Sequence, residues 1–317
     1  MQSTQYSIGQ LMATREAFGR ALVNLGKTNP DLVVLDAEMS NSTFTNLFQA
    51  KFPDRFFEMF IAEQNMLSTA LGLSLAGKVP FVATFAAFLT RAYDQIRMAQ
   101  YTNPKTNIKI MGSHCGVSIG EDGPSQMALE DIAFFRTILN GVVLYPSDAV
   151  STEAVVKIML EYHGISYLRA TREKLPVLYN SLTKFKIGGS RTIFQSDNDQ
   201  ITVIGAGITL HEAIKAYKIL QTQNVNIRVI DLYSIKPLDL ETLTKAGIET
   251  QAIIVVEDHF QEGGIYEAVC SSNIIKVPIH SLAVTKTPRS GTPAELLAFE
   301  KIDVVAIVNK TKQILGK

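Results

Sequence analysis

The segment 112–126 concentrates residues that could bind a polar ligand. Its fifteen residues include four glycines and one proline, together with His114, Glu121, Asp122 and Gln126. A short apolar run precedes this segment, and a helical pattern follows it. Loops of this length in compact domains are seldom only connectors and often carry function. We therefore expect the segment to bind a ligand, although a hydrogen-bonded core histidine is an alternative interpretation of His114.

A second candidate is Glu63, in the run Ile61-Ala62-Glu63-Gln64-Asn65-Met66. It stands where the apolar run 56–61 gives way to helical spacing. Open α/β sheets bind their ligands at the carboxyl ends of strands, which would make Glu63 a ligand-facing carboxyl group. An exposed acid that complements the helix dipole fits the same spacing equally well. Both interpretations stay open on spacing alone.

Two aromatic residues, Phe85 and Phe88, stand three positions apart in Thr84-Phe85-Ala86-Ala87-Phe88. Core packing is the commoner fate of such residues. They could instead form an apolar box for a planar heterocycle, because aromatic rings stack on one another. In isolation, the spacing favours the core.

Two arginines are placed where an anion could bind. Arg15 lies in an expected early helix, and Arg172 follows an expected strand at 165–169. A guanidinium group suits phosphate, although most lone arginines are solvated surface charges. Arg172 is the better placed of the two, because it follows the carboxyl end of a strand.

The turn Gly205-Ala206-Gly207-Ile208-Thr209-Leu210 partly matches a dinucleotide-binding fingerprint, with Asp231 ending the next expected strand. Leu210 occupies the position of the third glycine, where close helix packing leaves no room for a side chain. Two glycines alone are a weak signal. A tight strand-to-helix turn is therefore favoured over a nicotinamide site.

Short β-branched runs alternate with helical patterns along the chain, which predicts two α/β domains. Strands are expected at 32–35, 79–84, 108–113, 142–146, 165–169, 201–204, 227–230 and 252–256, and helices from about Ala62 and near 90–101, 126–136, 149–162 and 210–222. Strands joined through helices imply a parallel sheet covered on both faces. We predict two doubly wound domains, 1–175 and 199–317, joined by a glycine-containing linker at 176–198.

Composition argues against several classes of protein. The 317 residues have a formal net charge of zero, which gives no electrostatic case for nucleic-acid or membrane partners. No stretch approaches the roughly 20 apolar residues of a membrane span, and the first residues do not form a signal peptide. The two cysteines, Cys115 and Cys270, fit a reducing compartment. We expect a soluble, cytoplasmic protein.

Taken together, these runs closely resemble transketolase. The matching segments are Ile61–Met66, Thr84–Phe88, Arg91–Met98, Gly112–Gln126, Val203–Gly207, Leu210–Ala213, Ile235–Asp239, Glu257–His259, Glu262–Gly264 and Pro288–Gly291. The resemblance covers nearly the whole chain, and the glutamate run and the long loop are its most specific parts. It implies a thiamine-diphosphate-type pyrimidine-binding domain followed by a transketolase C-terminal-like domain.

The resemblance also implies that part of the enzyme lies on another chain. Transketolases bind thiamine diphosphate between two domains, and one of these grips the diphosphate through a divalent metal. That domain carries a Gly-Asp-Gly motif, which this sequence lacks. We therefore expect no metal ligands here, and Mg²⁺ or Ca²⁺ held by an N-terminal transketolase subunit. This chain would also pair with itself, as one natural split subunit of a heterotetramer; an expression fragment is the alternative.

By resemblance, Glu63 is the catalytic residue. Its carboxyl group would hydrogen-bond the aminopyrimidine ring nitrogen and stabilise the imino tautomer that activates the thiazolium carbon. Phe85 and Phe88 would stack around the pyrimidine, with Gln126 close by. These four residues make up the expected cofactor site.

The expected substrate site has two parts. His114 and Asp122 would contact the sugar hydroxyls, and Arg15, Ser42 and Arg172 would hold the sugar phosphate. The reaction implied is transfer of a two-carbon ketol unit from a ketose phosphate to an aldose phosphate, as in the pentose phosphate pathway.

Three alternative functions stay open on the sequence alone. They are the beta subunit of a 2-oxo acid dehydrogenase decarboxylase, half of a deoxyxylulose phosphate synthase, and a non-catalytic transketolase-like scaffold. The form of the loop 112–126 argues against the two enzymes. The presence of Glu63, His114 and Asp122 argues against the scaffold.

Overall fold

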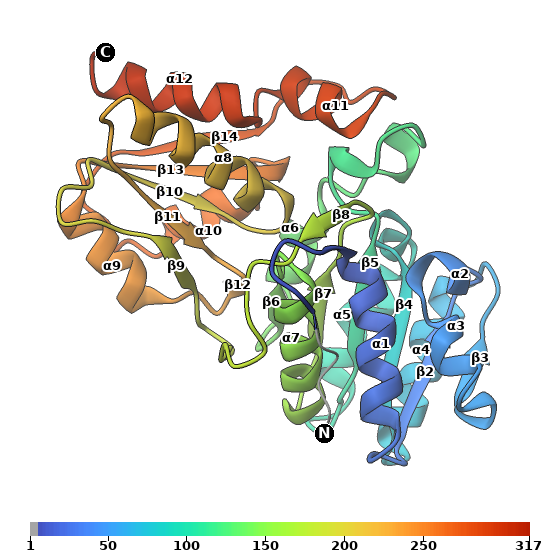
Figure 1. The fold of residues 1–317 in the computed structure, drawn as a ribbon. Helices are drawn as coiled ribbons and strands as arrows, with labels where there is room; N and C mark the ends of the chain where they lie inside the picture. Colours follow the sequence, from blue (N-terminus) through green and yellow to red (C-terminus); the bar gives the residue numbers. More distant parts are fainter. Residues whose placement is uncertain (1–5) are drawn as a thin grey trace.

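The computed structural model describes residues 6–317 and folds them into two α/β domains (Figure 1). The first domain is built on a seven-stranded sheet in the order β12-β6-β7-β5-β4-β2-β3. Its strands are β2 (Leu32–Asp36), β3 (Phe56–Glu58), β4 (Val79–Phe85), β5 (Lys109–Ser113), β6 (Val142–Leu144), β7 (Ser166–Arg169) and β12 (Ser234–Lys236). Neighbouring strands are parallel, except that β12 runs antiparallel to β6.

Helices cover both faces of this sheet. They are α1 (Thr14–Gly26) and α7 (Ala149–Glu161) on one face, and α4 (Glu63–Leu75), α5 (Tyr93–Thr102) and α6 (Asp131–Arg136) on the other. The alternation of side chains along β2 serves both layers. Leu32 and Val34 pack with the α1 and α7 side chains, whereas Val33 and Leu35 pack with those of α4. A strand buried on both faces is a continuous apolar run, which explains why the sequence pattern located β2.

The second domain repeats this design on a smaller sheet, in the order β14-β13-β10-β11-β9. Its strands are β9 (Arg191–Phe194), β10 (Ile201–Gly205), β11 (Ile227–Asp231), β13 (Ala252–Phe260) and β14 (Ile279–Val284). Its helices are α8 (Ile208–Thr222) and α12 (Val304–Ile314) on one face, α9 (Leu240–Glu249) and α10 (Ile265–Ser271) on the other, and α11 (Pro293–Glu300). The predicted α/β fold with two doubly wound domains is confirmed.

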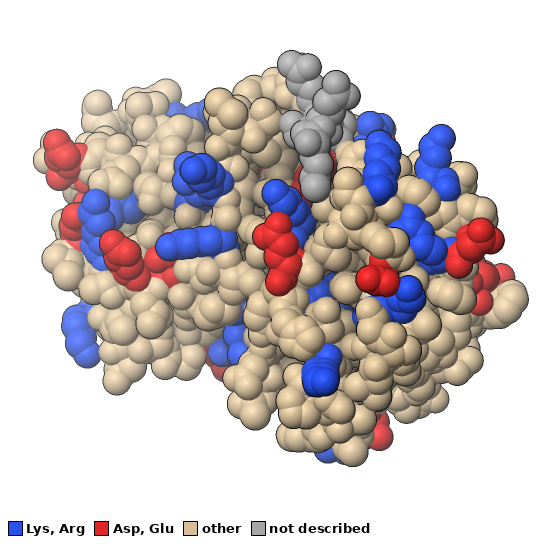
Figure 2. All heavy atoms as spheres, turned by 90° about the horizontal axis from the view of Figure 1, so that it is seen from below, with Lys and Arg blue, Asp and Glu red and all other residues tan. Residues whose placement is uncertain are grey.

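Short elements complete the chain and connect the layers. They are β1 (Leu11–Ala13), which pairs with β8 (Lys174–Pro176), α2 (Ser40–Thr43), α3 (Asn46–Gln49), and the 3₁₀ turns η1 (Pro53–Arg55), η2 (Ala86–Ala92), η3 (Val117–Ile119) and η4 (Pro124–Gln126). Within residues 6–317, no helix combines the length and apolar character needed to cross a bilayer. Lys, Arg, Asp and Glu are interspersed on the face that Figure 2 shows.

The boundary between the domains is less simple than the predicted linker at 176–198. That range contains β9, which pairs antiparallel with β11 at the edge of the second sheet. Conversely, β12 follows β11 in the chain but joins the first sheet beside β6. Both strands are short and lie at sheet edges, so they lack the long apolar run that marks a buried strand. The exact domain boundaries remain a prediction.

Two predicted helices begin later than expected. The helix expected near 90–101 starts as the 3₁₀ turn η2 and becomes α-helical at Tyr93, and the one expected near 126–136 is helical only from Asp131. In both places the residues before the helix belong to the loops that follow β4 and β5. These loops lie at the carboxyl edge of the first sheet, where α/β domains place their ligands.

Candidate active site

Glu63 begins α4, directly after the short loop that leaves β3. Its side chain is only 2% exposed, which excludes the exposed first-turn acid as an interpretation. Its carboxylate Oε1 accepts a hydrogen bond from an Nη of Arg91 at 2.9 Å, and the Arg91 side chain is 51% exposed. A buried carboxylate at a helix N-terminus is stabilised by the helix dipole and here also by one cation.

Aromatic rings extend from Arg91 across the carboxyl edge of the sheet. The Arg91 guanidinium lies 4.6 Å from the centre of the Phe88 ring. Phe88 stacks on Phe85 with centroids 5.4 Å apart, and Phe85 stacks on His114 with centroids 3.8 Å apart. Phe85 is buried and Phe88 is half-buried, so this stack reaches from the core towards the surface. Phe88 thus contacts the Arg91 side chain that pairs with Glu63, and the two phenylalanines are not part of the core alone.

His114 is buried and held in an unusual backbone conformation. Its φ is 57°, in the left-handed region, and its Nδ1 lies 2.9 Å from the Ser113 hydroxyl. Burial, followed by the positive charges of Arg15 and Arg172, lowers the pKa of His114 to about 3. The imidazole is therefore neutral at pH 7 and carries one N–H donor and one nitrogen acceptor.

Arg15 lies in α1 and holds the short helix α2, which carries Ser42. An Nη of Arg15 donates a hydrogen bond to the Ser42 carbonyl at 2.6 Å, while its Nε is buried and has no hydrogen-bond partner. Burial and then the charge of Arg172 lower the pKa of Arg15. The two neighbouring guanidinium groups repel each other, and one of them has a buried donor without a partner. An anion bound between them would reduce the repulsion and accept a hydrogen bond from that donor.

Helix α2 and the residues that flank it are held in place by Asp36, the last residue of β2. The Asp36 carboxylate accepts hydrogen bonds from the Thr43 hydroxyl at 2.6 Å, the Thr45 hydroxyl at 2.8 Å and the Met39 amide at 2.6 Å. Burial raises the pKa of Asp36 to about 6. Sequence analysis missed this residue, although a polar residue that ends a buried apolar strand was a usable signal.

Arg172 faces the long loop from the end of β7. An Nη donates to the Ile119 carbonyl at 2.6 Å and lies 3.5 Å from a carboxylate oxygen of Glu121 and 3.6 Å from one of Asp122. The Arg172 side chain is 34% exposed, as is that of Asp122. Gln126 ends the turn η4, which contacts η2, the turn that carries Phe88.

These contacts link the expected site residues in one series. Glu63 is joined through Arg91, Phe88 and Phe85 to His114. The positive charges of Arg15 and Arg172 help to lower the pKa of His114. All of the residues follow or flank carboxyl ends of strands in the first sheet. The structure thus gathers all nine expected site residues at one edge of the first domain, with Gln126 linked only through its turn.

The second domain holds the long loop in place. Gly116 has φ 77°, and a Cβ atom built on it would lie 1.8 Å from a carboxylate oxygen of Asp258 in β13. A Cβ on Gly123, with φ 80°, would lie 2.5 Å from the Ser290 hydroxyl. The turn η3 within the loop also packs on α11. The glycines therefore allow a close approach between the loop and the second domain.

A buried ion network beneath this loop was not anticipated from the sequence. The Arg169 guanidinium is 2.8 Å from a carboxylate oxygen of Asp131 and 2.8 Å from one of Asp258, and all three side chains are at most 1% exposed. Tyr145 and Tyr167 donate hydrogen bonds to the same two carboxylates. Because Asp258 belongs to the second domain, Arg169 joins the two domains directly under the candidate site.

Protein side chains fill the space beside the glycine turn at 205–210 where a dinucleotide would bind. A Cβ atom on Gly207 would lie 2.0 Å from the Tyr145 ring, so the glycine is needed for packing against the first domain. The Asp231 carboxylate accepts hydrogen bonds from the Ser147 hydroxyl at 2.8 Å and the Tyr179 hydroxyl at 2.6 Å. The tight-turn interpretation is confirmed, because ribose hydroxyls and a pyrophosphate would have to displace these partners.

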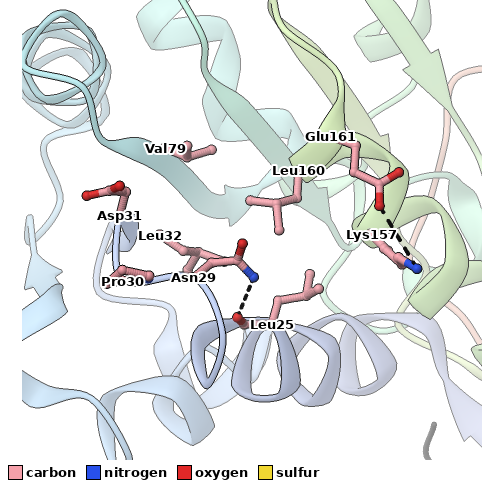
Figure 3. Close-up of a pocket in the computed structure, with 9 residues that line it drawn as sticks. All are labelled: Leu25, Asn29, Pro30, Asp31, Leu32, Val79, Lys157, Leu160 and Glu161. Carbon is pink, nitrogen blue, oxygen red and sulfur yellow. Dashed lines mark hydrogen bonds and ion pairs between the residues drawn. The ribbon is translucent and has the colours of Figure 1, made fainter. Parts of the chain in front are cut away.

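A pocket of about 380 Å³ lies at the opposite end of the first domain (Figure 3). Its lining includes Leu32 and Val79, which begin β2 and β4, and the Lys157–Glu161 pair at 4.0 Å. The candidate site residues stand at the other ends of these strands. The pocket is thus separate from the candidate site.

Comparison with models of known protein families identifies the family to which this chain belongs. The family model described as "Transketolase, pyrimidine binding domain" matches residues 10–177, and the one described as "Transketolase, C-terminal domain" matches residues 191–307. The chain belongs to the transketolase family.

Transketolases of known sequence extend this result. Human transketolase is 47% identical over 316 residues, which cover 98% of this chain and 50% of the human protein. The mouse protein named "Transketolase-like protein 2" is 52% identical over 316 residues, again covering 98% of this chain and 50% of the relative. The chain spans about half the length of these curated relatives.

Solved transketolase structures share the fold. The structure described as "Split gene transketolase, inactive beta4 tetramer" has a TM-score of 0.85 and 37% identity, covering 95% of this chain and 97% of that one. The transketolase from Campylobacter jejuni has a TM-score of 0.82 at 20% identity and covers 99% of this chain and 48% of its own, which shows a shared fold.

Proposed function

We propose that this chain is the C-terminal subunit of a two-chain transketolase. It would transfer a two-carbon ketol unit from a ketose phosphate to an aldose phosphate with thiamine diphosphate. The observation that carries the proposal is the series of contacts from Glu63 to His114, with Arg15 and Arg172 close enough for their charges to lower the pKa of His114. It lines up a buried carboxylate, aromatic faces, a neutral imidazole and two guanidinium groups along one edge of a transketolase pyrimidine-binding domain.

The second chain would supply what this chain lacks. Full-length relatives are about twice as long, and a similar chain is described as an inactive tetramer of a split-gene transketolase. We therefore assign the diphosphate and its Mg²⁺ or Ca²⁺ to an N-terminal subunit. This chain would pair with itself within the heterotetramer, and activity would require both subunits.

The residues present fit the aminopyrimidine half of the cofactor. Phe88 offers a half-buried aromatic face and Glu63 offers a buried carboxylate oxygen, and both contact the same Arg91 guanidinium. Thiamine diphosphate supplies the nucleophilic carbon and the electron sink for carbon–carbon bond cleavage. Glu63 would hydrogen-bond the pyrimidine ring nitrogen and hold a proton there. Phe85 and Phe88 would orient the ring, with Gln126 at its border.

The sugar phosphate would lie along the rest of the edge. The neutral His114 can donate to one hydroxyl or carbonyl oxygen and accept from another, while the Asp122 carboxylate can accept from a hydroxyl. Arg15 has a buried Nε without a partner, and Arg172 is partly exposed beside it, so both could bind the phosphate together with Ser42 of α2. These groups would align the sugar carbonyl and exchange protons with it.

We also propose that the enzyme works in the cytoplasm, in the pentose phosphate pathway. Both cysteines are unpaired, which fits a reducing compartment. Sugar phosphates of that pathway carry the ketone or aldehyde and the terminal phosphate that the site would recognise.

The proposal is tested by a ketol-transfer assay with xylulose 5-phosphate, ribose 5-phosphate, thiamine diphosphate and Mg²⁺. The assay is run on the chain alone and on the complex that it forms in its own cell extract. Activity in the complex alone supports the proposal. Activity of the chain alone contradicts the split site, and decarboxylation of 2-oxo acids by the complex would point to a dehydrogenase subunit instead. Silence of both would favour a non-catalytic scaffold.

A further inference from the structure

Arg91 makes two contacts whose combination is unusual for a side chain that is half exposed. Its guanidinium lies over the Phe88 ring at 4.6 Å and donates to Glu63 at 2.9 Å. The same group therefore stacks on an aromatic face and hydrogen-bonds a buried carboxylate. Neither contact was part of the expected site.

A guanidinium group and an aminopyrimidine share the features that these contacts use. Both are planar, and both can hydrogen-bond a carboxyl group through a nitrogen atom. Both also stack on aromatic rings. In the proposed function, the aminopyrimidine would stack on Phe88 and hydrogen-bond Glu63. Arg91 now makes both of these contacts, so the two groups compete for the same partners.

We propose that Arg91 is a placeholder for the aminopyrimidine ring: it occupies the ring's contacts in the cofactor-free chain and must swing out when the cofactor binds. This inference rests on the proposed function of the site. It makes Arg91 a positioning residue that keeps the Glu63 carboxylate paired until the cofactor arrives.

The burial of the two partners fits this role. Glu63 is 2% exposed and fixed in the first turn of α4, so it cannot follow Arg91 into water. Arg91 is 51% exposed, and its guanidinium can reach solvent by side-chain rotation. An ion pair that is open to water on one side is weak enough to be displaced. A buried carboxylate without any partner would destabilise the folded chain. Arg91 avoids this penalty while the cofactor is absent.

The test is a titration of thiamine diphosphate, with Mg²⁺ in excess, into the cofactor-stripped complex of this chain and its partner subunit. Binding is followed by calorimetry rather than by turnover. Arg91→Met keeps much of the apolar stem but removes both contacts of the guanidinium. The variant should bind about fivefold more tightly, because the site no longer has to open first. A crystal structure of the loaded wild-type complex should show Arg91 detached from both Glu63 and Phe88.

Arg97→Met is the matched control. Arg97 follows in α5, and its guanidinium pairs with the exposed Asp94 at 2.7 Å rather than with a buried group. This variant should bind the cofactor with wild-type affinity. Unchanged or weaker binding by Arg91→Met, with tight binding by the wild type, overturns the placeholder and leaves the proposed function standing. Failure of the wild-type complex to bind thiamine diphosphate overturns both.

Discussion

Arg169 and Arg172 stand three positions apart at the end of β7, yet the molecule uses them in opposite ways. Arg169 is fully buried and makes 2.8 Å ion pairs with Asp131 and Asp258, one from each domain. Arg172 is 34% exposed, donates to the Ile119 carbonyl, and keeps its nearest carboxylates at 3.5 Å or more. The first guanidinium has its charge neutralised by protein, whereas the second retains capacity for an outside anion.

The difference shows what distinguishes a structural charge from a binding charge. Arg169 also donates to the Ala128 and Asp258 carbonyls, so its donors are used within the fold. Arg15, beside Arg172, has a buried Nε without a partner. The donors of Arg169 are used within the fold, while the unused Nε of Arg15 leaves a donor for an outside anion.

The largest effect should come from breaking the buried network. Arg169→Met leaves two buried carboxylates without their cation, so the free energy of unfolding should fall by about 3–5 kcal/mol. Urea unfolding followed by circular dichroism measures the loss, with Arg172→Met as the matched control, which should change stability by no more than about 0.5 kcal/mol. Equal effects of the two substitutions would abolish the distinction between these arginines.

Removing the proposed proton-holding group should be nearly as severe, but in activity rather than stability. Glu63→Gln keeps the size of the side chain and should lower kcat of the complex about a thousandfold, with the melting temperature little changed. Glu161→Gln, at the pocket of Figure 3, is the control and should keep full activity. Near wild-type ketol transfer by Glu63→Gln would refute the assigned role.

The binding arginine should show its effect in substrate affinity. Arg172→Gln removes the charged donor that we propose binds the phosphate, and the KM for sugar phosphates should then rise about tenfold to a hundredfold. The matched measurement uses the same sugars without their phosphate, on which wild type and variant should be equally poor. A similar loss on both kinds of sugar would mean that Arg172 acts through the loop instead.

The smallest predicted effect is on pH dependence. The folded-state pKa of His114 is about 3, below the ordinary value of 6.5, so the neutral form stabilises the fold above pH 6.5 and this stability is lost as the pH falls. Between about pH 6 and pH 4, the wild type should lose about 1 kcal/mol more per pH unit than His114→Gln. Urea unfolding across this range measures the difference. His259, whose pKa burial lowers to about 4, is present in both proteins and cancels. Parallel pH profiles would contradict the neutral, buried His114.

The sequence pattern located the layers of the fold but not the contacts between them. Apolar runs such as Leu32–Leu35 marked the central strands, because burial on both faces leaves a local signal. The pairing of Arg169 with Asp258 spans 89 positions and leaves none. From the sequence alone, Arg169 could not be distinguished from Arg172. Only the position of the second domain, which brings Asp258 to Arg169, shows the difference.

Most candidate site residues could be predicted because they lie in short local sequence runs, with Arg91 as the exception. Glu63, His114 and Asp122 lie in runs that resemble transketolase motifs, and the structure brings their neighbours together at one edge. Arg91 belongs to such a run as well, but its role depends on a rotamer that stacks it on Phe88. Side-chain direction of that kind cannot be read from residue spacing.

We propose that this chain supplies the pyrimidine and sugar contacts while another chain holds the diphosphate. The most direct test is the structure of the assembled complex with thiamine diphosphate and Mg²⁺, by crystallography or electron microscopy. We expect the pyrimidine ring on Phe88 with its ring nitrogen at the Glu63 carboxyl group, and the diphosphate and metal bound by the partner chain. A diphosphate bound by this chain, or a pyrimidine ring away from Glu63, would contradict it.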